Sequence, residues 1–80
     1  MEHKIKILEK YASEHLKGIK PWELRKNDRN YKVGDTIEFE IVDEAGKRNG
    51  IKYLRLITNI LHGGVYGLEE GFCIMTITEY

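Results

Sequence analysis

The sequence contains few of the residues that small proteins use for cross-linking or nucleophilic catalysis. Its 80 residues include one cysteine, one proline and one tryptophan, and Ser13 is the only serine. Because Cys73 has no second cysteine to pair with, the fold must depend on a hydrophobic core instead of an internal disulfide. We interpret Cys73 as a small buried residue. Because the lone serine lies in a short helical segment, no Ser-His-Asp triad is expected.

Recognisable metal and cofactor motifs are missing as well. The chain has three histidines: His3, His15 and His62. They lack metal-ligand spacing, so we expect no metal site. His62 is interpreted as a solvated loop residue. The glycines between positions 63 and 71 match neither a Walker loop nor a dinucleotide fingerprint, and no cofactor is expected.

No charge sign dominates, and no long apolar run is present. The net charge is zero, with 41% hydrophobic and 32% charged residues, which is a globular balance. The uncharged stretches are too short to span a bilayer, and Met1–Lys4 begins a polar segment instead of a signal peptide. We therefore expect a soluble cytoplasmic protein with no membrane partner, and one domain over residues 1–80.

The zero net charge averages two unequal parts. Residues 1–32 carry nine basic and five acidic side chains, a net charge of +4, and residues 33–80 carry four basic and eight acidic ones, a net charge of −4. Such a split is typical of an electrostatic footprint, and a mixed solvated surface is the alternative interpretation.

Residue periodicity predicts one short helix among five strands. A helical stripe predicts a helix over residues 9–17, with Gly18 as its left-handed C-terminal cap. Alternation of period two indicates strands over residues 3–8, from Lys20 onward, over 36–42, over 51–61 with a bulge, and over 72–78.

A small sheet of this kind leaves exposed edges unless it curls. The sequence therefore predicts an α+β fold: a small antiparallel β-barrel of about five strands, with a short helix after the first strand that covers one opening. In the strand after Lys20, Trp22 and Leu24 are expected to point into the core, and Glu23 and Arg25 to share the other face.

Residues Gly18–Arg25, GIKPWELR, match the pattern G-x-K-x-x-E-x-R. This segment resembles the signature of the ASCH (activating signal cointegrator homology) domains of the PUA-like superfamily. Val33-Gly34-Asp35 before a strand fits as well, and the loop His62–Phe72 resembles a small uncharacterised bacterial and phage branch. The resemblance covers nearly the whole chain. It implies a PUA-like pseudo-barrel, an RNA-binding role, and a cleft between helix and barrel where the motif residues gather.

The motif also has a direct physical interpretation. Lys20 follows the predicted helix cap, where its ammonium can meet a phosphate or pair with Glu23. Glu23 and Arg25 project from one strand face, so the carboxylate can orient the guanidinium for bidentate contact with a phosphate or a base edge. The alternative is an ion pair that only stabilises the barrel rim.

Further residues extend this candidate site. Lys26 and Arg29 cluster in the turn after the motif and would add a positive rim. Tyr31 and Tyr66 lie in predicted loops, where each ring could stack on a base or be partly buried. The predicted RNA- or ligand-binding residues are Lys20, Glu23, Arg25, Lys26, Arg29 and Tyr66.

Three functional hypotheses follow. The favoured one is an RNA- or nucleotide-binding module. The second is a small hydrolase of acetylated cytidine or of RNA, as the resemblance implies for some members, with Lys20 as base or nucleophile assisted by Glu23. This chain departs from the amidohydrolase-like members, which have threonine at the position of Glu23 and a glutamate from a longer insertion. The third is a protein-interaction module that uses the acidic strand face of Glu38, Glu40, Asp43 and Glu44.

Overall fold

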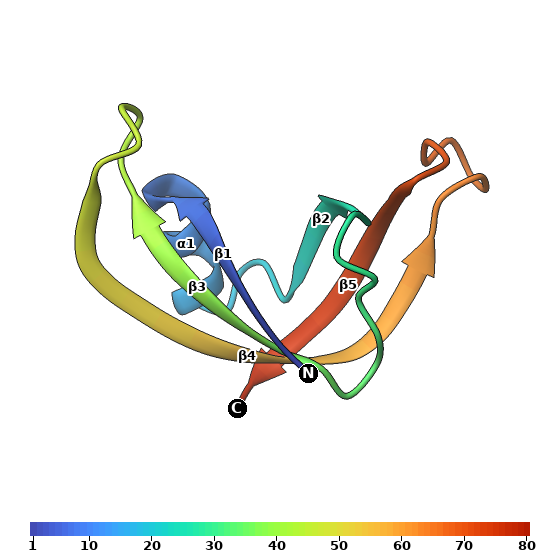
Figure 1. Cartoon of the computed structure of the whole chain (residues 1–80), viewed down its shortest axis with the longest axis horizontal. Helices are drawn as coiled ribbons and strands as arrows, with labels where there is room; N and C mark the ends of the chain where they lie inside the picture. The colour runs from blue at the N-terminus through green and yellow to red at the C-terminus, as the bar shows by residue number, and fades with distance from the viewer.

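The computed structural model describes all 80 residues, which form one helix and five strands (Figure 1). In chain order these elements are β1 (Glu2–Leu8), α1 (Glu9–Leu16), β2 (Trp22–Lys26), β3 (Thr36–Val42), β4 (Arg48–His62) and β5 (Phe72–Glu79). The strands make one sheet in the order β1-β3-β4-β5-β2. The predicted sequence of one strand, a short helix and four further strands in a small α+β fold is confirmed.

The sheet is mixed, so the prediction of an antiparallel barrel is wrong for one pair of strands. β1 and β3 run parallel, with Ile5 opposite Phe39 and Ile7 opposite Ile41, and the other three pairs are antiparallel. Between β1 and β3 the chain passes through α1 and β2. A long connection of this kind lets β3 enter the sheet in the same direction as β1. The curved sheet is a half-barrel, because its outer strands β1 and β2 do not pair with each other.

The curvature of the half-barrel comes from β4. This strand is 15 residues long and pairs with β3 through its first part and with β5 through its second (Figure 1). The register shifts between Glu40 and Val42 and between Ile57 and Asn59. Bulges bend a strand and increase its twist, which lets one long strand serve both arms of the molecule. The predicted bulge is confirmed, although β4 begins at Arg48, before the predicted strand over residues 51–61.

The concave face of the half-barrel holds the hydrophobic core. Its largest fully buried side chains come from the middle of the sheet and are Ile37, Phe39, Ile57, Cys73 and Met75. The interpretation of Cys73 as a small buried residue is confirmed, and burial raises the pKa of its thiol. Tyr31, for which the sequence left two alternatives, is buried in the same core and has no free ring face for a ligand.

The helix α1 covers one end of this core with Ala12 and His15. It ends where the sequence predicts, because Gly18 has a φ of +74°, in the left-handed region that glycine adopts at helix ends. The Gly18 N–H donates to the His15 carbonyl. α1 has eight residues, and the structure contains no helix that is long and apolar enough to cross a membrane.

The prediction for the faces of β2 is wrong. Trp22 and Leu24 are 43% and 46% exposed, whereas Glu23 between them is 4% exposed. Alternation along a strand shows which residues share a face, but not which face is buried. In β2 the inward face carries the Glu23 carboxylate, and hydrogen bonds and ion pairs compensate for its burial.

Asp35 connects β1 to the start of β3. Its Oδ2 atom lies 2.8 Å from His3 Nε2 and accepts a hydrogen bond from the Lys32 N–H at 3.1 Å. His3 is buried, and the edge of its ring lies against Tyr31 with centroids 4.7 Å apart. The hydrogen bond from His3 is the main reason why the pKa of Asp35 lies below its ordinary value.

We expect Asp35 to make the fold sensitive to acid. A carboxyl whose pKa is lowered by folding stabilises the native state above its unfolded pKa of about 3.9, and this contribution is lost as the pH falls through the lower, folded pKa. Asp35→Asn should lower the free energy of unfolding at neutral pH by about 1–3 kcal/mol. Urea denaturation between pH 7 and pH 3 should show a smaller loss of stability for this variant than for the wild type. Equal pH dependence of the two proteins would contradict the assignment.

Candidate binding cleft

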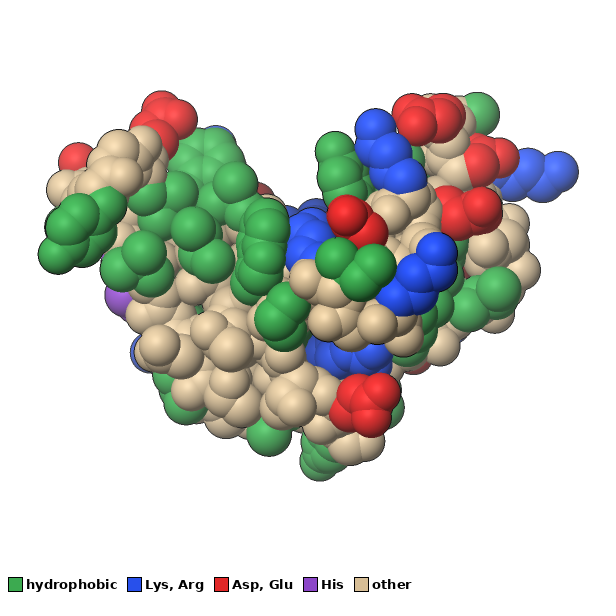
Figure 2. Space-filling view, turned by 180° about the vertical axis from the view of Figure 1, so that it is seen from behind, with side chains coloured by type: hydrophobic (Ala, Val, Ile, Leu, Met, Phe, Trp, Pro, Cys, Tyr) green, Lys and Arg blue, Asp and Glu red, His purple; other side chains and the backbone are tan.

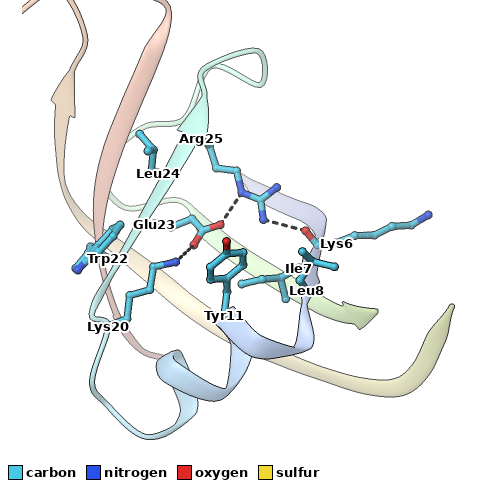
Figure 3. Close-up of a pocket in the computed structure, with 9 residues that line it drawn as sticks. All are labelled: Lys6, Ile7, Leu8, Tyr11, Lys20, Trp22, Glu23, Leu24 and Arg25. Atoms are coloured by element: carbon cyan, nitrogen blue, oxygen red, sulfur yellow. Dashed lines mark hydrogen bonds and ion pairs between the residues drawn. The ribbon is translucent and has the colours of Figure 1, made fainter. Parts of the chain in front are cut away.

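A cleft lies at the open side of the half-barrel, between β2 on one side and β1 and α1 on the other (Figure 3). The space-filling view shows the hollow between the two arms of the molecule (Figure 2). Its volume is about 450 Å³. The cleft is lined by Lys6, Ile7, Leu8, Tyr11, Lys20, Trp22, Glu23, Leu24 and Arg25. Its walls are therefore largely apolar, with a few charged groups that converge on one point.

That point is the carboxylate of Glu23. Its Oε1 atom lies 3.2 Å from His15 Nε2 and 3.4 Å from Lys20 Nζ, and its Oε2 atom accepts a hydrogen bond from Arg25 Nε at 2.6 Å. A buried carboxylate is stable only when such partners replace its lost hydration. The ion-paired group of Lys20, Glu23 and Arg25 keeps one net positive charge at the wall of the cleft.

Opposing effects act on the pKa of Glu23. Burial alone would raise it, but the hydrogen bond from His15 and the charges of Arg25 and Lys20 outweigh burial, so the pKa lies below its ordinary value. Glu23 is therefore ionised at neutral pH. Because both oxygens already accept hydrogen bonds, this carboxylate serves to orient its neighbours and is a poor acceptor for a further proton.

His15 fixes the carboxylate from the helix side. Its Nε2 atom faces two acceptors, Glu23 Oε1 and the Trp22 carbonyl at 3.1 Å, so Nε2 carries a hydrogen. In the neutral ring, Nδ1 then accepts a hydrogen bond from the Tyr53 hydroxyl at 2.7 Å. Burial, together with the negative charge of Glu23, raises the pKa of Tyr53, so the hydroxyl keeps its proton. Tyr53 in turn stacks on Phe39 of the core.

Arg25 spans the open side of the sheet. Besides its bond to Glu23, its Nη2 atom donates to the Lys6 carbonyl of β1 at 2.9 Å (Figure 3). This side chain therefore bridges the two outer strands. Its Nη1 amino group makes no hydrogen bond within the protein and is free to bind a ligand.

Lys20 lies between two aromatic rings. Its ammonium is 4.7 Å from the centroid of the Tyr11 ring and 4.8 Å from that of Trp22, within the range of cation–π attraction. These contacts, with the ion pair to Glu23, hold the lysine at the cleft. Tyr11 and Trp22 remain partly exposed, so each ring still offers surface to a ligand.

The structure brings together only part of the predicted site. Lys20, Glu23 and Arg25 meet in the cleft. Lys26 and Arg29 line a neighbouring hollow, to which Arg25 also contributes. Tyr66 lies in the loop between β4 and β5, is 97% exposed, and does not line either hollow. No three His, Cys, Asp or Glu side chains are placed together to hold a metal ion.

Sequence reasoning missed the residues that support the motif. The sequence predicts no metal site for His15 and assigns no role to Tyr53, which lies within the predicted strand over residues 51–61. One signal was present: a histidine on the inward face of a helix needs a polar partner, and the nearest acidic residue of the motif could supply it. The sequence predicts a core position for Trp22, whereas its side chain is partly exposed and lines the cleft together with Tyr11.

The fold and the cleft define a small α+β half-barrel protein with an ion-paired cleft at its open side. The sequence matches a family model over residues 2–77, so the chain belongs to the family described as Domain of unknown function (DUF3850). A search of curated proteins found no match to the sequence.

Removal of the Glu23 carboxylate should destabilise the protein, because the partners of a buried charge are then left uncompensated. We expect Glu23→Ala to lower the free energy of unfolding by about 3–5 kcal/mol. Glu23→Gln keeps the size of the side chain and one hydrogen-bond acceptor, so it should lower the free energy of unfolding by less than Glu23→Ala does. Glu69→Ala, which removes an exposed carboxylate from the β4–β5 loop, is the matched control. Urea denaturation followed by circular dichroism measures all three. An effect of Glu23→Ala no larger than that of the control would show that the ion-paired group does not stabilise the fold.

Proposed function

We propose that this protein binds RNA or a nucleotide in the cleft around Glu23. The observation that carries the proposal is the buried carboxylate, which orients Lys20 and Arg25 beside two partly exposed aromatic rings. Cations held in place next to ring faces match a ligand that carries a phosphate and a planar base.

The charged groups favour an anionic ligand. The ion-paired group keeps one net positive charge at the wall of the cleft, whereas the Lys6 side chain points away from it (Figure 3). Because Arg25 is already held by Glu23 and the Lys6 carbonyl, little conformational entropy is lost when its free Nη1 group binds a phosphate oxygen.

The apolar walls favour a ligand with a planar apolar part. Tyr11 and Trp22 are each about two-fifths exposed, and the cavity of about 450 Å³ is within the usual range for small-ligand sites. Stacking of a base on such a ring contributes about 1–3 kcal/mol and requires no particular base. A bare phosphate would leave these walls without a partner.

The resemblance of Gly18–Arg25 to the ASCH signature supports the same proposal. That resemblance implies a PUA-like pseudo-barrel and RNA binding, and it places the motif residues in a cleft between helix and barrel. Lys20, Glu23 and Arg25, the fixed charged positions of the motif, are the residues that meet here. We assign the protein to this superfamily as part of the proposal.

Binding is favoured over hydrolysis by the state of Glu23. Lys20 can act as a base or nucleophile only after its ammonium loses a proton, and Glu23 is a poor acceptor for that proton, because the pKa of its carboxyl is lowered and each oxygen already accepts a hydrogen bond. The hydrolase hypothesis, with Lys20 as base or nucleophile, is kept as an outcome of the test.

Trp22 is the only tryptophan and lines the cleft, so its fluorescence should report binding directly. We expect single-stranded RNA to change this fluorescence, with log affinity falling linearly with log salt concentration. Arg25→Ala should weaken binding about 10- to 100-fold and reduce the slope of the salt dependence by about 1, because one charged phosphate contact is lost.

Arg48→Ala is the matched control for that variant. Arg48 lies at the β3–β4 hairpin outside the cleft, and its replacement removes the same charge. No RNA binding by the wild type at low salt would refute the proposal. Turnover of RNA or acylated nucleosides that disappears in Lys20→Ala would replace it with the hydrolase hypothesis.

A further inference from the structure

The open side of the half-barrel continues beyond the cleft. β1 and β2 are the outer strands of the sheet, and the Arg25 side chain bridges them at the Lys6 carbonyl. On the far side of this bridge from Lys20 lies a second hollow of about 370 Å³. It is lined by Lys4, Ile5, Lys6, Arg25, Lys26, Asp28, Arg29 and Tyr31. We call the cleft, the bridge and the second hollow together the seam.

The second hollow is strongly basic. Five of its lining residues are basic (Lys4, Lys6, Arg25, Lys26 and Arg29), and the single acidic one is Asp28. Of the five cations, only Arg25 is ion-paired, with Glu23. Five cations with one carboxylate among them repel each other, and a bound anion relieves this repulsion.

The two hollows share the residues of the bridge. Arg25 and Lys6 line both of them, so a ligand can pass from one hollow to the other without leaving the protein surface. The hollows differ in character: the cleft has exposed rings and apolar walls, whereas the second hollow is cationic and its tyrosine, Tyr31, is buried. The cleft therefore suits a base, and the second hollow suits a phosphate.

We propose that the seam binds a single-stranded segment of at least two nucleotides. This inference rests on the proposed function: one nucleotide occupies the cleft, and the chain then crosses Arg25 so that the next phosphate meets Lys26 and Arg29. A single strand is favoured over a duplex because the bases must be unstacked to reach the rings in the cleft.

Lys26 and Arg29 are the residues with which to test the second hollow. Both are exposed, so their replacement should leave the fold intact. Lys4 and Lys6 are less suitable, because Glu38 and Glu40 lie opposite them in the register of β1 and β3 and reduce their local charge. The double variant Lys26→Ala/Arg29→Ala therefore removes two cations of the second hollow without touching the cleft.

The experiment measures affinity against ligand length. Trp22 fluorescence is titrated with uridine 5′-monophosphate and with 5′-phosphorylated oligouridines of increasing length. For the wild type we expect affinity to rise about tenfold or more from the mononucleotide to the dinucleotide. The double variant should bind the mononucleotide like the wild type and lose this increase. Lys47→Ala/Arg48→Ala, which removes the same charges from the β3–β4 hairpin, should keep it.

The possible results separate the two proposals. No binding of any ligand refutes the proposed function itself. Mononucleotide binding without a gain for longer ligands, or a gain that persists in Lys26→Ala/Arg29→Ala, overturns the seam while the proposed function stands. An oligoglutamate of equal charge that competes as well as the oligouridine also overturns it, because the second hollow would then select acidic peptides as readily as nucleotides.

Discussion

The structure depends on how one buried charge is compensated. Glu23 lies on a five-residue outer strand, and three cationic or donor groups converge on its carboxylate: His15 from α1, Lys20 from the connection to β2, and Arg25 from β2 itself. A lone carboxylate at this position would cost several kcal/mol, whereas the paired one holds a helix and a strand in register. Through Arg25 the same network reaches the Lys6 carbonyl, and so β1. The residue that stabilises the open side of the half-barrel therefore also shapes the cleft.

The unclosed sheet leaves two exposed strand edges, and basic side chains gather beside them. Outer strands expose unpaired backbone groups, which invite edge-to-edge association, and lysine side chains are a common protection. Here Lys4 and Lys6 on β1 and Lys26 on β2 provide that protection, and Arg25 bridges the gap. The same cations give the seam its positive charge. The zero net charge of the chain therefore conceals a local basic surface at the open side.

The arrangement of elements was predictable because each has a local signal. Gly18 marks the end of α1, and alternating residues mark β3 and β5. The direction of β1 relative to β3 was not predictable, since it depends on where the chain goes between them. Trp22 and Leu24 show the same limit: hydrophobicity favoured burial, but the compensated charge of Glu23 occupies the inward face of β2 instead.

The sequence by itself determined the helix, the strands and the grouping of Lys20, Glu23 and Arg25, because these three residues lie within one short segment whose local geometry brings them together. Only the tertiary structure decided which face of that segment is buried, that His15 and Tyr53 support its carboxylate, and that Lys4 and Lys6 join it across the open side. Those contacts link residues far apart in the chain or on different elements. They follow from the curvature of β4 and from the parallel return of β3 to β1, which no local pattern encodes.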